Sequence, residues 1–416
     1  MTIDQALFKR ISDRIDSYKE DCIRLQFGLS AIPALSPENG GDGELPKARF
    51  LAERLRELGF SDIFEINAPD DRVSSGLRPN LIARVPGKHA DRTVWIMTHL
   101  DIVPPGEASL WHSDPYQGYV KDGLIYGRGT EDNQQDMVAS IFAAKAFLDL
   151  GLTPESGIGL AFVSDEETAS RFGISHVLAD SKNPFRKSDI IVVPDSGNEE
   201  GTMIEVAEKS INWLRFRTLG KQCHGSRPNE GINAFRAASY LAVALDELHQ
   251  VFPAADPFFD PPGSTFQPTK KEANVPNVNT IPGEDVFYLD SRILPQYKLA
   301  EVMAAIRSRV EAVEKRFGVA VEITPVQQVE APAATAHDAP VVLALAEAAR
   351  EVYKVEATPQ GVGAGTVAAY FRKEDYPVAV WSRVLQKAHQ PDECCSLANL
   401  IGNAKVFAHL FLQTGR

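Results

Sequence analysis

The chain of 416 residues is short of cysteine, of positive charge and of long apolar runs, and each shortage excludes a class of protein. Its four cysteines are too few for a disulfide framework and are typical of a reducing compartment. Lysine and arginine number 43 against 56 acidic residues, and the net charge of −13 repels a phosphate backbone. No apolar run approaches the roughly 18 residues that span a bilayer. We therefore expect a cytoplasmic protein that binds neither nucleic acid nor membrane.

What the sequence does contain, over its first half, is an alternation of short β-rich runs with helical stretches. Strands are expected at 63–66, 81–85, 94–98, 158–163 and 190–193, and helices at 51–58 and 133–150. This order predicts an α/β fold in which helices cover a mixed sheet.

From about residue 208 the rhythm changes to a compact strand-and-helix unit of the split βαβ kind. Strands are expected there at 211–218, 286–293 and 319–324, and helices at 232–251 and 299–317. After Pro325 the α/β rhythm resumes, with helices at 341–352 and 396–412 and a strand at 378–381. We therefore expect one domain from residues 1–207 and 325–416, with a smaller α+β domain inserted at 208–324.

Residues of metal-ligand type follow three of the expected strands. In open α/β sheets, ligands bind beyond the carboxyl ends of the strands, so these residues should meet at one edge of the sheet. A glycine turn also brings Asp132 to the start of the expected helix at 133–150, where it could otherwise serve only as an N-cap. The residues that follow the strands are His99 and Asp101, then Glu166 and Glu167, then Asp195.

Taken singly, each of these residues has an ordinary structural explanation, but together they indicate a metal site. On an extended backbone His99 and Asp101 share a face, and a carboxylate beside a metal-binding histidine typically accepts its second ring N–H. Carboxylates and imidazoles without thiolates suit zinc, cobalt or manganese, and they favour a catalytic site over a structural one.

With these motifs the chain resembles the co-catalytic metallopeptidases that include acetylornithine deacetylase, succinyl-diaminopimelate desuccinylase, aminoacylase and the glutamate carboxypeptidases. The resemblance extends over nearly the whole chain, but Gln134-Gln135 stands where many members carry Lys-Gly. The matching motifs are His99-x-Asp101, Gly127-Arg128-Gly129-x-x-Asp132, Asp165-Glu166-Glu167, Asp195, His224-Gly225-Ser226-x-Pro228, Gly231-x-Asn233-Ala234, Asn279-Thr280-Ile281-Pro282-Gly283, Asp290-x-Arg292 and His389-x-x-x-Glu393.

The resemblance implies a site with two divalent ions, zinc foremost, with cobalt or manganese as alternatives. One ion would be held by His99 and Asp195, and the other by Glu167 and His389. Asp132 would bridge the two ions.

By the same resemblance, Glu166 is the general base and Asp101 belongs to the catalytic residues beside it. A cis peptide bond is expected between Asp132 and Asn133. The glycine-rich segment 361–366 corresponds to a loop whose backbone N–H groups and hydroxyl, here that of Thr366, hold the substrate carboxylate.

The inserted domain would act as a lid and as the dimerisation surface. The resemblance implies that two chains pair through residues of about 208–324. His224 would then cross to the partner's site and donate a hydrogen bond to the tetrahedral oxyanion, with Asn279 nearby as a second polar contact.

Arg292 is a candidate for recognising a substrate carboxylate. On the expected strand it lies opposite the apolar face of Phe287, Leu289 and Ile293, so its guanidinium should project away from the domain core. Arginine suits bidentate recognition of a carboxylate. The alternative is a surface arginine that pairs with Asp290.

The sequence thus predicts a metal-dependent hydrolase that cleaves the amide bond of N-acyl amino acids or small peptides, as a deacetylase, desuccinylase or dipeptidase does. One alternative is a catalytically inactive metal-binding regulatory protein on the same scaffold, although a pure binding site has no use for Glu166. A second alternative is a thiol redox protein that uses Cys394 and Cys395. Phosphate binding at 361–366 is disfavoured, because no Gly-Lys-Ser/Thr follows the glycines.

Overall fold

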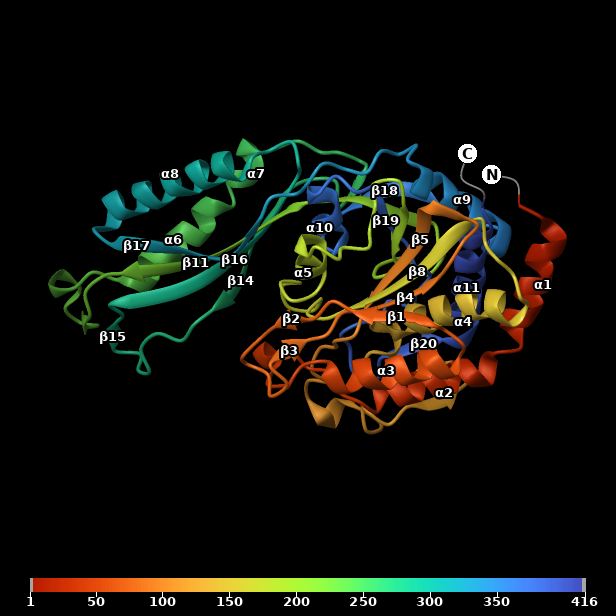
Figure 1. Ribbon diagram of the computed structural model, residues 1–416. Helices are drawn as coiled ribbons and strands as arrows, with labels where there is room; N and C mark the ends of the chain where they lie inside the picture. The colour runs from red at the N-terminus through yellow and green to blue at the C-terminus, as the bar shows by residue number, and fades with distance from the viewer. Residues whose placement is uncertain (1–2, 414–416) are drawn as a thin grey trace. The chain divides into compact units, whose positions relative to one another are not determined.

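The computed structural model describes residues 3–413, and the chain divides into two compact units (Figure 1). The first unit comprises the residues up to Val206, Thr335–Pro359 and those from Thr366 onward; the second comprises Ala207–Ala334 and Gln360–Gly365. The second unit thus extends beyond the expected boundary after residue 324. Its strand β17 (Ala320–Val329) runs through Pro325, which a strand at the edge of a sheet tolerates.

The first unit is built on a large mixed sheet, as predicted. Its strands follow the order β1-β4-β8-β5-β9-β19-β10-β18. The pairs β5–β8, β5–β9 and β9–β19 are parallel, whereas β1–β4, β4–β8 and β10–β19 are antiparallel. The strands are β1 (Asp62–Glu65), β4 (Leu81–Val85), β8 (Ser156–Val163), β5 (His89–His99), β9 (Ile190–Val193), β19 (Val378–Val380), β10 (Met203–Glu208) and β18 (Thr358–Val362).

Helices cover both faces of this sheet (Figure 1). On one face α4 (Gln135–Asp149) and α11 (Leu397–Leu412) contact β5 and β8, and α1 (Gln5–Asp16) and α9 (Pro340–Tyr353) pack against α11. On the other face α5 (Ile174–Ala179) and α10 (Ala368–Lys373) bury Trp95 and Met97 of β5. Because both faces are covered, the central strands consist of continuous apolar runs, and every residue of β8 and β9 is buried.

The structure adds elements that the sequence pattern did not reveal. Strands β10 and β18 and helices α5 and α10 were not expected, and helix α3 (Leu45–Glu57) begins six residues before the expected helix at 51–58. The remaining elements of the first unit are α2 (Lys19–Ser30), α3 (Leu45–Glu57), β2 (Ala68–Pro69), β3 (Leu77–Arg78), β6 (Tyr119–Lys121), β7 (Leu124–Tyr126) and β20 (Cys394–Ser396).

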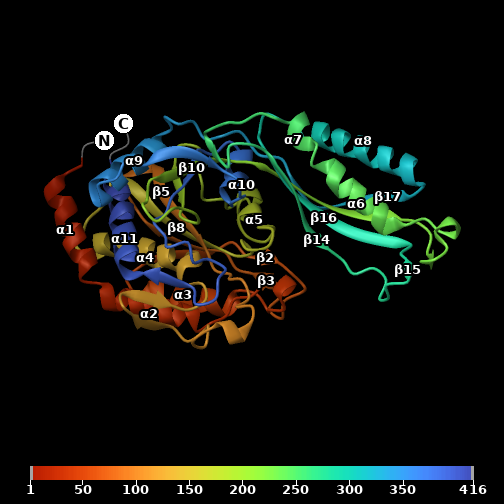
Figure 2. The same cartoon turned by 180° about the vertical axis from the view of Figure 1, so that it is seen from behind.

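The second unit is a four-stranded antiparallel sheet with two helices on one face (Figures 1 and 2). The strand order is β14-β16-β11-β17, with β14 (Thr265–Lys271), β16 (Glu284–Ile293) and β11 (Ser210–Leu219). Alternate side chains of β11 and β16 pack against α6 (Ala234–Leu245) and α8 (Leu299–Phe317) in an apolar core.

Two details of the second unit differ from expectation. The helix expected at 232–251 is interrupted, and its second part is α7 (Leu248–Val251). Strand β14 lies in a stretch where neither a strand nor a helix was expected. The short strands β12 (Cys223–His224) and β15 (Thr280–Ile281) pair with each other, and β13 (Phe259–Asp260) pairs with residues 361–362 of β18. In the described part of the chain, no helix is both long and apolar enough to span a bilayer.

Candidate metal centre

Three parallel neighbours in the sheet, β8, β5 and β9, end at the same edge and bring acidic and imidazole side chains together there. His99 is the last residue of β5, Glu166 and Glu167 lie just beyond β8, and Asp195 follows β9. This is the edge at which open α/β sheets bind their ligands.

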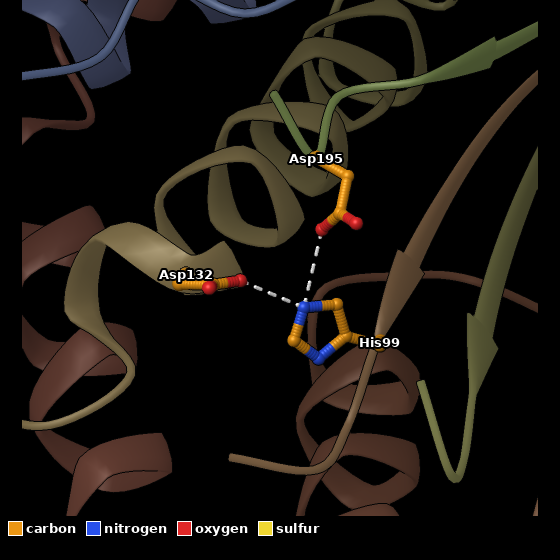
Figure 3. A group of neighbouring side chains, drawn as sticks. All are labelled: His99, Asp132 and Asp195. Carbon is orange, nitrogen blue, oxygen red and sulfur yellow. Dashed lines mark hydrogen bonds and ion pairs between the residues drawn. The ribbon is translucent and has the colours of Figure 1, made fainter. Parts of the chain in front are cut away.

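The side chains form two clusters that share Asp132. In the first cluster, His99 Nε2 lies 2.9 Å from Asp132 Oδ1 and 3.2 Å from Asp195 Oδ1 (Figure 3). In the second, His389 Nε2 lies 3.1 Å from Asp132 Oδ2 and 3.1 Å from Glu167 Oε2. The two oxygens of Asp132 therefore face different clusters, and within each cluster the possible ligand atoms lie within 4.8 Å of one another.

Asp132 reaches this position because the chain is not helical where we expected the helix to begin. The segment Thr130–Gln134 has non-helical dihedral angles at Asp132 and Asn133, and the peptide bond between these two residues is cis, as expected. The regular helix α4 starts only at Gln135.

The second ring nitrogen of His99 has a partner other than the one we predicted. Nδ1 lies 3.0 Å from the backbone carbonyl of Asp101 and 3.6 Å from its carboxylate. Because a carbonyl only accepts, Nδ1 donates to it, and Nε2 is the ring nitrogen directed at the cluster, where it would offer its lone pair to a metal ion. The Asp101 carboxylate instead accepts the backbone N–H groups of Glu166 (3.1 Å) and Glu167 (3.0 Å), and so fixes the turn after β8.

The clusters hold more negative charge than the protein alone neutralises. Burial, reinforced by Asp195, raises the pKa of Glu166 well above its usual range, and burial together with Asp132 also raises the pKa of Glu167. Hydrogen bonds to Asp132 and Glu167 raise the pKa of His389 to about 10. Glu167 Oε1 is buried and has no hydrogen-bond partner among the described residues. A divalent cation would relieve each of these conditions.

Two further buried carboxylates, those of Glu393 and Glu131, hold the backbone segments that carry ligand residues. Glu393 accepts hydrogen bonds from the guanidinium of Arg128 (2.5 Å) and from the backbone N–H groups of Gly129, Glu131 and Asp132 (3.0 Å each). It thereby holds the segment that carries Asp132.

Glu131 holds the opposite segment, which carries His389. Its carboxylate accepts the backbone N–H groups of Leu385 (2.5 Å), Lys387 and Ala388 (3.1 Å). Sequence reasoning assigned no role to Glu131 and placed Glu393 only in a motif. The sequence offered one signal for each residue. Glu131 is adjacent to the expected ligand Asp132, and Glu393 lies four residues after the expected ligand His389.

A pocket of about 290 Å³ lies beside the first cluster. Its walls carry small or neutral side chains together with three carboxyl groups. It is lined by Glu131, Asp132, Pro194, Asp195, Ser196, Gly197, Val384, Gln386 and Ala388.

The other site residues expected from the sequence have partners within their own units. In the second unit, His224 Nδ1 lies 2.8 Å from Ser226 Oγ, and Asn279 accepts a hydrogen bond from Asn277. In the first unit, the Thr366 hydroxyl lies 3.3 Å from Glu205 Oε1.

Arg292 has the arrangement that was the alternative to carboxylate recognition. In the second unit its guanidinium donates to both oxygens of Asp290 (2.8 and 3.2 Å) and to the carbonyl of Gly363 (3.1 Å).

The cysteines do not have the environment of a redox pair. Cys394 and Cys395 are buried and free, and burial raises the pKa of Cys394 to about 11 and that of Cys395 well above its usual value. Such thiols carry almost no thiolate, which is the reactive form.

Comparison with known proteins identifies the family. The model of peptidase family M20/M25/M40 matches residues 95–413. A protein of Methanococcus maripaludis described as an uncharacterized metallohydrolase is 37% identical, over 94% of this chain and 98% of its own. A succinyl-diaminopimelate desuccinylase of Methylorubrum populi is 30% identical, over 91% of this chain and 94% of its own.

Solved structures share the fold at low sequence identity. Human carnosine dipeptidase 1 superposes with a TM-score of 0.79 at 18% identity, over 99% of both chains. The dipeptidase Dug1p of Saccharomyces cerevisiae superposes with a TM-score of 0.75 at 15% identity, over 97% of this chain and 98% of its own. The chain therefore belongs to peptidase family M20/M25/M40 and is a metal-dependent hydrolase of that family.

Proposed function

We propose that this metallohydrolase uses two divalent ions to cleave the amide bond of N-acyl amino acids or small peptides. The observation that carries the proposal is the pair of clusters that share Asp132 through its two oxygens. His99 and Asp195 would hold one ion, Glu167 and His389 the other, and Asp132 would bridge them. Imidazole and carboxylate donors suit zinc, with cobalt or manganese as alternatives. The bound ions would polarise the scissile carbonyl and make an attacking water more acidic.

Glu166 is the proposed general base. Its backbone N–H is held by the Asp101 carboxylate, and its raised pKa suits a group that both accepts and returns a proton. It would take the proton from the attacking water and pass it to the leaving nitrogen. Asp101 would act by fixing the turn that carries both Glu166 and Glu167.

The substrate would carry a free carboxylate. Arg292 and Thr366 are the proposed contacts, and Asp290 would then share the guanidinium with the substrate. Desuccinylases among the relatives and dipeptidases among the solved structures support two substrate branches, N-deacylation and dipeptide cleavage.

The proposed active form is a homodimer joined through the second unit. Helix α6 exposes the apolar side chains of Phe235, Tyr240 and Val243, and β14 is an edge strand with free backbone groups to pair. The proposed role of His224 is that of a hydrogen-bond donor. Its Nδ1 accepts the backbone N–H of Ser226 (3.2 Å), so the ring proton would be on Nε2. Its partner would be the oxyanion in the other chain's site, with Asn279 nearby.

The dimer proposal is tested by mixing inactive variants. Equal amounts of His224→Ala and Glu166→Gln protein should regain part of the activity, because a heterodimer has one site with both groups intact. No recovery, under conditions where subunit exchange is demonstrated, contradicts the proposal.

The central test is a substrate screen with defined metal content. Metal-stripped protein, and the same protein reloaded with zinc, cobalt or manganese, would be offered N-acetyl and N-succinyl amino acids and dipeptides, with release of free amine as the measurement. We expect turnover only after two ions per chain have bound. Full activity in protein shown to be metal-free would overturn the proposed mechanism, and a two-ion protein that cleaves none of these compounds would favour the inactive regulatory alternative.

A further inference from the structure

We infer that Glu131 and Glu393 are positioning residues that set how many ions the centre holds, and that Glu131 acts selectively on the position of Glu167 and His389. The inference rests on the proposed two-ion function and deepens it. Neither carboxylate belongs to the two ligand clusters, and each acts through backbone N–H groups.

The segment that carries His389 needs an anchor of this kind. His389, Gln386 and Asp392 all have left-handed backbone conformations, with φ of 62°, 60° and 54°, which are unfavourable for residues other than glycine. Residues 386–391 are exposed, so no buried side chain of theirs holds the loop in place. Without an external restraint, this stretch would relax toward more favourable backbone angles and move His389.

The Glu131 carboxylate supplies that restraint immediately before His389. One of its oxygens accepts from Leu385 and the other from Lys387 and Ala388, so both oxygens are in use. An amide at this position would present an N–H₂ group to an N–H donor on one side. A glutamine can therefore satisfy only part of the arrangement, although its shape is nearly the same.

Glu393 acts on the other side of the centre. It holds the backbone N–H of Asp132 itself, as well as those of Gly129 and Glu131. Glu393 thus binds the backbone of Glu131, and the side chain of Glu131 in turn binds the backbone of the segment that carries His389. Because Asp132 faces both clusters and His389 only one, loss of the Glu393 charge should affect both ion positions, and loss of the Glu131 charge mainly one.

Asp189 offers a matched control within the same sheet. It is a buried carboxylate that also accepts three N–H groups, from the backbone of Thr93 (2.8 Å) and Arg186 (2.8 Å) and from the indole of Trp95 (2.9 Å). It precedes β9, at the edge of the sheet opposite to the candidate metal centre. Replacing Asp189 removes comparable hydrogen bonds without altering the segment that carries Asp132 or the segment that carries His389.

The experiment measures zinc binding rather than turnover. Wild type, Glu131→Gln, Glu393→Gln and Asp189→Asn would be titrated with zinc in competition with a chelating dye, with bound metal measured after dialysis and unfolding followed in urea. We expect Glu131→Gln to bind one zinc about 10- to 100-fold more weakly and to retain the other, and Glu393→Gln to bind both more weakly. Asp189→Asn should lose stability but bind both ions as the wild type does.

Two results would overturn the inference. One is a Glu131→Gln protein that binds both ions with wild-type affinity, and the other is an Asp189→Asn protein that loses zinc to the same extent. If Glu131→Gln does not fold, Glu131→Asp keeps the charge but shortens the reach, and it should lose the same single ion. A wild type that binds no second ion would instead refute the proposed function, so the two failures are distinguishable.

Discussion

The two units of the chain bury different chemistry. Around the candidate metal centre the first unit buries carboxylates, among them Glu44, Asp101 and Glu393, whereas the core between the helices and sheet of the second unit is apolar. Ion pairs of the second unit such as Arg217–Glu284 lie on its surface. The difference teaches that the first unit depends on paired buried charges for the geometry of its site, while apolar packing forms the core of the second, in which Asp285 is a buried carboxylate that pairs with Lys271 (2.5 Å).

The sharpest test of this contrast is at Glu166. We expect Glu166→Gln to lower turnover about 10²- to 10⁴-fold, because the proton shuttle is lost, and to leave metal content unchanged. Steady-state kinetics and elemental analysis measure the two quantities. Glu322→Gln, in the second unit, is the control and should keep normal turnover; a Glu166→Gln protein with near wild-type turnover would mean that the base lies elsewhere.

The next largest effect is expected at Arg78, whose guanidinium is fully buried. It binds both oxygens of Glu44, one of them at 2.6 Å, and lies 3.4 Å from Asp70 and 3.8 Å from Asp165. Arg78→Met should lower the free energy of unfolding by about 3 to 5 kcal/mol, since buried carboxylates lose their partner. Urea denaturation measures this loss, and a value below about 1 kcal/mol would show that the buried charges are not mutually dependent.

In the second unit the corresponding loss should come from an apolar side chain. Leu241 of α6 is fully buried in the helix–sheet core. We expect Leu241→Ala to cost about 2 to 5 kcal/mol through the lost burial and the cavity left behind, with zinc binding unchanged. Glu311→Ala, at an exposed position of α8, should change stability by less than about 0.5 kcal/mol. Loss of zinc binding in Leu241→Ala would contradict the expectation that the apolar core of the second unit does not affect the metal centre.

The smallest effect is expected at Arg217, the surface counterpart of Arg78. Arg217 pairs with Glu284 (2.7 Å) and Glu322 (3.2 Å), but all three side chains are at least one-third exposed. Arg217→Met should therefore cost less than about 1 kcal/mol, and the cost should shrink as salt is added. A loss as large as that at Arg78 would show that the surface network is as important as the buried one.

Elements with a clear local pattern could be predicted from the sequence. Helix α8 has the predicted bounds, 299–317, and it ends where Gly318 adopts a left-handed conformation (φ 70°). Strand β14 was missed because Pro268, Lys270 and Lys271 are typical of a loop. Proline and lysine are also what an edge strand tolerates, and β14 is an edge strand.

The same division applies to the candidate site. Residues such as His99 and Asp195 could be found because each lies at the end of an apolar strand or within two residues of it. The contacts of Glu131 and Glu393 could not be predicted, because a carboxylate that accepts backbone N–H groups leaves no pattern in the sequence around it. The groups that it binds lie more than 250 positions away along the chain.

The insertion of the second unit also bears on the order in which the protein is made. Translation yields β5, β8 and β9 with their ligand residues first, then the whole of the second unit, and only afterwards the residues 385–393 that complete the centre. Domains generally begin to fold as they leave the ribosome, and contacts between distant positions form slowly. The second unit can thus fold on the nascent chain, whereas a chain that stops before His389 lacks a residue of the second candidate ligand cluster. Under the proposed two-ion function, the position of Glu167 and His389 would therefore be filled only after residue 389 has been made, whereas His99, Asp132 and Asp195 are present earlier.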